Sequence, residues 1–333
     1  MAFNDIAGNG HVKKILRIAL QRRRLPNSLL FCGPQGVGKR ETALVVAKAL
    51  NCLQMTDDSC DSCDNCLAID KGAFDRNKRA FPDLIEISPE KDIIKIEQMP
   101  IIKEMAYLKP MIGRKRVFIV DEAEKMNEES ANSILKVLEE PPAFSHIILL
   151  SDNQSFLLPT IKSRCQVLNF LPVSKEEIEQ ALRDRGFEDD RARILALLVR
   201  GNLEQALDLD WDEIQARRKE AWALFLSLIG REDSSLFLRQ FAFQRRKDVE
   251  DDLAQMLELF ASFCRDVLLI KEGGPAELLF NPDYEGPLRD SEPAVSAEQP
   301  LRWLGLIDAA LANLDRNLNV SLLVSSFYSQ AIG

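Results

Sequence analysis

The sequence lacks the features that mark membrane, secreted and DNA-coating proteins. None of its apolar runs approaches the roughly 18 residues of a membrane-spanning helix. Its first residues contain neither a basic segment nor an apolar block, so we expect no secretory signal, no membrane association and a cytoplasmic protein. A formal net charge of -9 argues against a protein that coats nucleic acid by bulk electrostatics.

The sequence also lacks internal repeats and low-complexity tracts. Hydrophobic residues make up 46% and charged residues 29% of its 333 residues, which is typical of a globular protein with two or three domains. In a cytoplasmic protein, its seven cysteines are expected to be reduced or bound to metal rather than paired in disulfides.

The first half of the chain alternates strand-like and helix-like segments. Runs rich in Ile, Val and Leu predict strands at residues 28–32, 82–88, 116–122 and 146–151. The segment before the first strand is predicted to form a helix ended by Pro26. Strands that alternate with helices predict a parallel sheet covered on both faces.

From about Val173 the strand signal vanishes and helices follow. Ser174 with Glu177 forms a capping-box pattern that begins a helix. A polar connection near 281–300 is predicted before a last helix. An apolar stripe at alternating steps of four and three residues predicts a long helix packed into a bundle, formed by Val249, Leu253, Met256, Phe260, Phe263, Val267 and Ile270.

A glycine-rich loop, GPQGVGKR, follows the first predicted strand and opens a helix. In such a loop the backbone N–H groups at Gly33, Gly36 and Gly38 point at phosphate oxygens, and Lys39 adds a positive charge. The phosphate-binding pattern has a hydroxyl after the lysine to hold Mg²⁺, and here Arg40 takes that place. Thr42, two residues further round the helix, is not expected to replace it.

Two acidic residues, Asp121 and Glu122, follow the strand predicted at 116–122. At the carboxyl end of a strand in an α/β sheet, an Asp can orient a metal ion and a Glu can polarise an attacking water. The alternative is an acidic pair that only caps a helix. Next to a glycine-rich loop, the nucleotide-site interpretation is favoured.

Four cysteines cluster in one short stretch, with the spacing C-x₇-C-x₂-C-x₂-C. Cys52, Cys60, Cys63 and Cys66 can surround one Zn²⁺ tetrahedrally, and four thiolates leave no position for water, so the site is expected to be structural. The alternative is a set of free thiols in a solvated loop. The remaining cysteines are expected to be packing residues, at Cys32, Cys165 and Cys264.

In order and spacing these motifs resemble the bacterial clamp-loader ATPases, of the AAA+ class, that belong to DNA polymerase III. The similar stretches run from about Phe3 to Phe170, and weaker similarity continues through 201–207 and the last helix. The resemblance implies an α/β fold with a RecA-like P-loop domain, a helical lid and a helical collar. We place these parts at 1–172 (zinc insert 52–66), 173–213 and 214–333.

Two branches of this family carry the zinc insert, the gamma/tau ATPases and the delta-prime branch, which usually lacks a working site. The sequence departs from the ATPase pattern at Arg40, at Glu204, where an arginine would face the γ-phosphate, and at Asp152, where a neutral polar residue is expected. The resemblance therefore implies the delta-prime branch, with Asp121 and Glu122 vestigial, weak ATP binding and no Mg²⁺. It further implies that Arg164, in Ser-Arg-Cys, acts in trans on a neighbour's ATP.

The implied function is that of a clamp-loader stator in a pentameric ring with gamma/tau and delta subunits. It would help to place the sliding clamp on primed DNA, reaching both through the complex, with no ATP hydrolysis of its own. It would be a subunit of the DNA polymerase complex without carrying out polymerisation.

Two alternatives remain. The first is an active gamma-like clamp-loader ATPase, because Lys39, Asp121 and Glu122 are retained. The second is a zinc-dependent DNA-binding protein with an incidental P-loop, although an acidic insert would repel phosphate. The basic clusters at 22–24 and 114–116 are expected to be solvated faces rather than DNA contacts.

Overall fold

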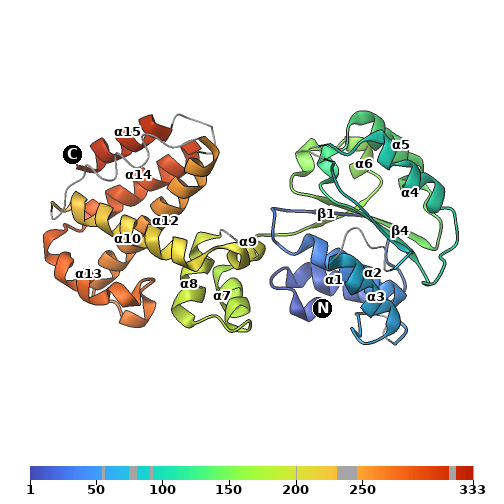
Figure 1. The fold of residues 1–333 in the computed structure, drawn as a ribbon, viewed down its shortest axis with the longest axis horizontal. Helices are drawn as coiled ribbons and strands as arrows, with labels where there is room; N and C mark the ends of the chain where they lie inside the picture. The colour runs from blue at the N-terminus through green and yellow to red at the C-terminus, as the bar shows by residue number, and fades with distance from the viewer. Residues whose placement is uncertain are drawn as a thin grey trace. The chain divides into compact units, whose positions relative to one another are not determined.

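The computed structural model describes residues 1–54, 57–74, 81–90, 93–199, 201–230, 246–314 and 320–332. The chain divides into two compact units (Figure 1). One comprises Met1–Ile178 with Gly201–Glu204, and the other comprises Glu179–Arg200 with Gln205–Gly333. Two helices, α7 (Lys175–Arg183) and α9 (Leu203–Asp208), cross the division between the units.

The first unit is built on a five-stranded parallel sheet with the strand order β2-β3-β4-β1-β5. The strands are β1 (Ser28–Cys32), β2 (Leu84–Ile87), β3 (Arg116–Val120), β4 (Ser145–Ser151) and β5 (Gln166–Asn169). The first four lie where the sequence predicts them. The sequence gives no signal for β5, because this edge strand buries only Leu168 fully and has no apolar run.

Helices cover both faces of this sheet, as Figure 1 shows. On one face lie α1 (Gly10–Gln21), α2 (Lys39–Asn51) and α3 (Asp64–Phe74), and on the other lie α4 (Pro100–Met105), α5 (Glu128–Glu139) and α6 (Pro159–Lys162). Every residue of β1, β3 and β4 is buried between them. The predicted parallel α/β class is confirmed.

Helix α1 ends at Gln21, earlier than the predicted stop at Pro26. The Arg23 N–H donates to the Leu20 carbonyl at 2.9 Å and the Arg24 N–H to the Ala19 carbonyl at 2.8 Å, which closes the helix. Three consecutive arginines favour a helix by propensity. The turn back into β1 overrides that preference.

Since all five strands run the same way, the sheet has two chemically distinct edges. The loops after β1, β3 and β4 gather at the carboxyl edge, and the segments before β1, β3, β4 and β5 gather at the amino edge. The P-loop lies at the carboxyl edge, and the basic clusters and Arg164 lie at the amino edge.

The second unit is helical, and the structure describes no strand in it. It contains α8 (Asp189–Leu198), α10 (Trp211–Leu228), α12 (Arg246–Lys271), α13 (Glu285–Ser291), α14 (Glu298–Leu314) and α15 (Val320–Ile332). The predicted long helix is α12, and its apolar stripe forms the core through Leu253, Met256, Phe260, Phe263 and Val267. Rings of Phe225, Phe260 and Trp303 pack together.

Two predictions for this unit are wrong in detail. The segment 281–300, expected to be a connection, contains α13, and the expected last helix consists of α14 and α15. The three-part domain division stays a prediction. Short 3₁₀ turns complete the structure, at Phe3–Asp5, Ile96–Gln98, Ala123–Lys125, Gln154–Phe156, Ala276–Leu278, Pro282–Tyr284 and Glu292–Ala294.

The capping box predicted from the sequence is present at the start of α7. The Glu177 N–H donates to the Ser174 hydroxyl, and the Ser174 N–H donates to the Glu177 carboxylate, each at 3.2 Å. Within the residues that the structure describes, no helix is both long and apolar enough to cross a membrane.

Candidate functional sites

The glycine-rich loop joins β1 to α2 at the carboxyl edge, in the context that the sequence predicts. Gly36 and Gly38 have φ angles of +67° and +87°, which side chains other than glycine rarely adopt. Lys39 is the first residue of α2, so the positive end of the helix dipole faces the loop.

Lys39 is engaged by the protein itself. Its Nζ donates to the carbonyl oxygens of Gly33 and Pro34 at 2.7 and 2.5 Å, and to Asp152 Oδ1 at 2.9 Å. The side chain is only 8% exposed, whereas Asp152 is 31% exposed. A phosphate at this position would have to compete with the Asp152 carboxylate for the lysine charge.

A second carboxylate adds to the negative charge beside Asp152. The Asp152 N–H donates to Glu124 Oε1 at 3.1 Å. The other oxygen, Glu124 Oε2, is buried and has no hydrogen-bond partner among the described residues. These carboxylates disfavour an anionic ligand at this point.

The residue that replaces the metal-binding hydroxyl is also paired. Arg40 Nη2 lies 2.6 Å from Glu86 Oε2 on β2. The Thr42 hydroxyl donates to the Gly38 carbonyl at 2.6 Å and is fully buried, so it is committed to its own helix. Neither residue presents a free hydroxyl to a metal ion.

The acidic pair follows β3 at the carboxyl edge. The Glu122 N–H donates to Asp121 Oδ1 at 3.1 Å, and the Glu122 carboxylate pairs with Lys125. Glu122 has a φ angle of +47°, a conformation that is uncommon for this residue type and often found at functional sites. Their role at a nucleotide site stays a prediction.

A segment distant in sequence closes over the glycine loop. The Leu203 N–H donates to the Gly36 carbonyl at 3.2 Å. Asn202 Oδ1 lies 1.5 Å from where a Cβ on Gly36 would stand, so the loop and this segment fit only with glycine at that position. Glu204, the predicted departure from the ATPase pattern, follows Leu203 as the second residue of α9 and is exposed. No local sequence motif indicates Asn202, because its contact with Gly36 joins residues that are distant in the chain.

The four predicted metal ligands are brought together. The Sγ atoms of Cys52, Cys60, Cys63 and Cys66 all lie within 4.8 Å of one another. Four sulfurs at about 2.3 Å from a Zn²⁺ ion would be about 3.8 Å apart, and Cys60 and Cys66 are 4.0 Å apart. The donor set fits one tetrahedral metal ion such as zinc.

The thiols of this cluster are not equivalent. Hydrogen bonds from Ser62, and then from the Cys63 N–H, lower the pKa of the Cys60 thiol to about 6. Burial raises the pKa of the Cys66 thiol. A bound cation would overcome that second effect, because metal coordination deprotonates a thiol.

The predicted packing cysteines lie in apolar surroundings. Cys32 and Cys264 are buried, and Cys165 packs half-buried against the core of the first unit. Burial raises the pKa of the Cys32 thiol to about 11 and that of Cys165 to about 12. Both thiols therefore stay protonated and unreactive at neutral pH.

Arg164 lies at the amino edge, before β5, and so at the opposite edge of the sheet from Lys39. Its Nε donates to Glu139 Oε2 at 3.0 Å and its Nη1 to the Thr160 carbonyl at 3.1 Å. Glu139 is 58% exposed, and exposed ion pairs contribute only about 0–1 kcal/mol. This ion pair therefore adds little to stability.

The expectation that residues 114–116 form a solvated face is wrong for Arg116. This residue is 1% exposed, and its Nη2 lies 2.8 Å from Oδ1 of the fully buried Asp83. Asp83 also accepts N–H bonds from Met111, Ile112 and Gly113. Burial alone would raise the pKa of Asp83, but these donors and Arg116 hold it below its ordinary value.

Comparison with known proteins is consistent with this arrangement. A family model described as DNA polymerase III, delta subunit, matches residues 8–174. DNA polymerase III subunit delta′ of Bacillus subtilis is 29% identical over 94% of this chain and 93% of its own length. DNA polymerase III subunit tau/gamma of Haemophilus influenzae is 33% identical over 62% of this chain, but only 30% of that protein is covered.

A solved structure of a DNA polymerase III gamma subunit-related protein from Thermotoga maritima covers 96% of this chain and 98% of its own. It is 18% identical, with a TM-score of 0.41.

Proposed function

Because the chain belongs to the DNA polymerase III delta subunit family, within the clamp-loader group of delta-prime and gamma/tau proteins, we propose that it is a delta-prime-type stator. In this role it joins a ring with gamma/tau and delta subunits in the cytoplasm. It then helps to load the sliding clamp onto primed DNA.

The ion pair between Lys39 and Asp152 carries this proposal. In a working P-loop the lysine charge stabilises the β- and γ-phosphates. Here Asp152 and two loop carbonyls occupy all three donor positions of Nζ, and Arg40 is paired with Glu86. ATP therefore binds weakly, Mg²⁺ has no hydroxyl ligand after the lysine, and the chain does not hydrolyse ATP.

In this proposal Arg164 acts on the ATP of a neighbouring subunit. It lies at the other edge of the sheet from the P-loop, so it cannot serve this chain's own loop, but it can reach ATP held by an adjacent subunit. A guanidinium given in trans stabilises the charge on the transferring phosphoryl group. Its exposed partner Glu139 costs little to displace.

The cysteine cluster supplies structure rather than catalysis. A Zn²⁺ ion held by Cys52, Cys60, Cys63 and Cys66 would have no open coordination position for water. The insert is tied to the domain by the fully buried Lys48 ammonium, which pairs with Asp61, and by the Arg17–Asp58 pair at 2.5 Å.

The test has two parts. The purified chain alone should show no steady-state ATP hydrolysis above that of its Lys39→Ala variant. Mixed with gamma/tau and delta subunits, it should enter a stable complex that loads the clamp, and leaving it out should abolish loading. Failure to assemble, or loading without it, would refute the stator assignment.

An active gamma-like subunit is the second candidate, because the P-loop, Asp121 and Glu122 lie together at the carboxyl edge. Its signature is ATP hydrolysis by the isolated chain that disappears in the Lys39→Ala variant. A zinc-dependent DNA-binding protein would instead bind DNA tightly by itself and lose that binding on removal of the metal.

A further inference from the structure

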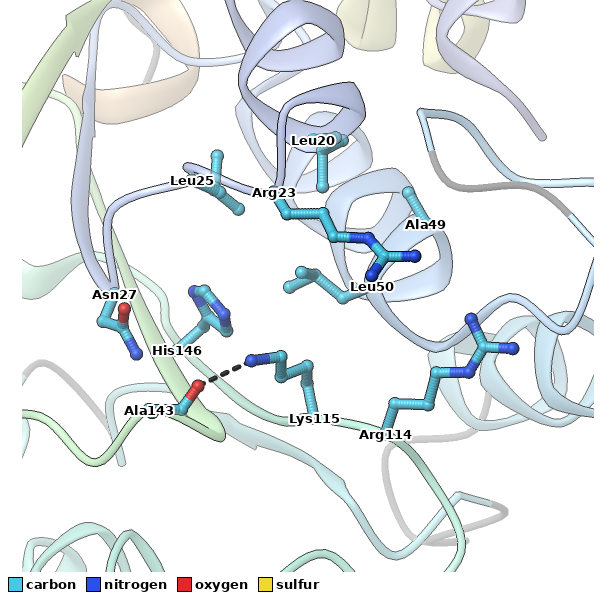
Figure 2. A pocket seen from close by; sticks show the side chains of 10 residues that line it. All are labelled: Leu20, Arg23, Leu25, Asn27, Ala49, Leu50, Arg114, Lys115, Ala143 and His146. Atoms are coloured by element: carbon cyan, nitrogen blue, oxygen red, sulfur yellow. Dashed lines mark hydrogen bonds between the residues drawn. The ribbon is translucent and has the colours of Figure 1, made fainter.

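The two basic clusters that the sequence places far apart meet at one pocket on the amino edge. Figure 2 shows this cavity of about 760 Å³, whose lining includes Arg23, Arg114, Lys115, His146, Leu20 and Leu50. Arg23 comes from the turn after α1, whereas Arg114 and Lys115 come from the loop before β3. Residues 22–24 are exposed, as predicted, and Arg114 is exposed beside them at the mouth of the pocket.

The charge of the pocket is one-sided. Its described lining contains three cationic side chains and no carboxylate. Lys115 Nζ donates one hydrogen bond to the Ala143 carbonyl, at 2.6 Å. Among the described residues, the guanidinium groups of Arg23 and Arg114 make no ion pair or hydrogen bond, so both are available to an anion.

The rest of the wall is apolar or neutral. Leu20, Leu25 and Ala49 are buried beneath the cations. Burial, and then the Lys115 charge, lower the pKa of His146 to about 4, so its ring is neutral at pH 7. Sites for small ligands have volumes of about 300–1,000 Å³ and combine apolar walls with a few polar groups.

The backbone at Arg23 points to the same conclusion. Its φ angle is +54°, and its N–H and that of Arg24 close α1 in the pattern that usually has glycine here. A left-handed conformation is unfavourable for arginine. Non-glycine residues in this conformation are often found at functional sites.

We propose that this pocket binds a nucleotide, with the phosphates against Arg23, Arg114 and Lys115 and the base against Leu20 and Leu50. A nucleotide combines a planar base, whose faces can pack on apolar side chains, with phosphates that carry two or more negative charges, and the wall offers leucines beside three cations. Free nucleotides and the terminal nucleotide of a DNA strand share this chemistry. The proposal does not depend on the stator assignment.

The test measures binding of four probes to the full-length chain by equilibrium dialysis: ADP, pyrophosphate, adenosine and a 5′-phosphorylated ten-nucleotide thymidine strand. Each is measured with and without Lys39→Ala, which separates the pocket from the P-loop. We expect ADP or the strand to bind at about 1 mM or tighter and to weaken with salt. Whichever of the two binds more tightly identifies the source.

Matched variants localise the binding. Arg23→Ala and Arg114→Ala should each weaken it by about tenfold, as the loss of a charge-assisted hydrogen bond implies. Arg22→Ala, which removes an exposed neighbouring charge outside the lining, should not. Arg23→Gly should weaken binding while raising the unfolding midpoint, because it removes the left-handed strain.

Several results would overturn the proposal. The proposal is wrong if neither ADP nor the strand binds, or if the Arg23→Ala/Arg114→Ala double variant binds as tightly as the wild type. It is also wrong if Lys39→Ala abolishes all binding. Pyrophosphate that binds as tightly as ADP would exclude a contact with the base. None of these results depends on whether the chain joins a clamp loader.

Discussion

The two edges of the central sheet differ in how their positive charges are used. At the carboxyl edge, Lys39 and Arg40 are both paired with carboxylates of the same chain. At the amino edge, Arg23 and Arg114 face a pocket that has no described carboxylate, and Arg164 pairs with the exposed Glu139 and donates to the Thr160 carbonyl. The two cations beside the nucleotide motif are paired within the chain, whereas at the opposite edge Arg23 and Arg114 have no ion pair among the described residues, although Arg116 there is paired with Asp83.

Neighbouring elements fix the position of the basic loop at the amino edge. Asn51, the last residue of α2, accepts the Lys115 N–H at 2.9 Å through its side chain, and its backbone carbonyl accepts from Asn65 of the insert. The cysteine cluster and the basic loop are therefore linked through one residue. Changes in the insert should be felt at the amino edge and not at the P-loop.

Loss of the metal should have the largest effect. Structural zinc contributes on the order of 10 kcal/mol of apparent binding free energy in small sites, so Cys63→Ser should release the ion and disorder residues 57–66 while the sheet stays folded. Elemental analysis should find one zinc per wild-type chain. Hydrogen exchange should rise in the insert and in 113–115.

Cys165→Ser is the matched control, because it removes a half-buried thiol outside the cluster and should leave the zinc content unchanged. A wild-type protein without zinc, prepared under conditions that spare the metal, would contradict this prediction.

Breaking the Asp83–Arg116 pair should have the second-largest effect on stability. Both groups are almost fully buried, and removing one partner of a buried ion pair costs about 3–5 kcal/mol. Asp83→Ala should lower the free energy of unfolding by that amount in urea denaturation. It should also free the loop that presents Arg114. Glu139→Ala, which breaks an exposed pair at the same edge, should cost under about 1 kcal/mol.

Acidification should act on the amino edge through His146. Its folded pKa of about 4 lies below the unfolded value of about 6.5, so the unfolded chain binds the extra proton. The contribution of neutral His146 to the free energy of unfolding is complete above about pH 6.5. It is lost as the pH falls toward 4, and amounts to on the order of 3 kcal/mol in total.

NMR titration checks this prediction, with His11→Gln used to assign the two histidine signals. Lys115→Met should raise the pKa of His146, because it removes the neighbouring charge. An ordinary pKa in the wild type would show that the ring is hydrated rather than buried.

The sequence could predict the strands and the metal cluster, but not which distant residues meet at each edge of the sheet. Apolar runs located four strands, and the spacing of the cysteines located the metal cluster, because both are local signals. The contacts of Lys39 with Asp152, and of Arg23 with the pocket of Arg114, join residues about a hundred positions apart. They depend on the strand order, which no local pattern contains.

The end of α1 was missed for a related reason. Arginines favour a helix, so nothing in the local sequence indicates that the chain turns at Arg23. Tertiary packing overrides propensity there.

The smallest effect concerns the carboxyl edge. Arg40→Ser restores a hydroxyl after the lysine, and Asp152→Asn removes the competing charge. Together they should tighten Mg-ATP binding by about tenfold, or about 1.4 kcal/mol, in a fluorescence titration of the isolated chain. Arg40→Ala with Asp152→Asn is the control that lacks the hydroxyl and should recover less. If neither variant binds Mg-ATP more tightly than the wild type, the segment at Asn202 and Leu203, rather than charge, blocks the loop.

The most direct test of the account is ATP turnover in the reconstituted clamp loader, with Lys39→Ala and Arg164→Ala compared side by side. The account predicts that Lys39→Ala leaves turnover unchanged. Arg164→Ala should silence the one neighbouring site that it serves, where an arginine in trans contributes roughly 10³–10⁵ in rate, while assembly stays intact. Turnover that falls with Lys39→Ala and is unaffected by Arg164→Ala would contradict it.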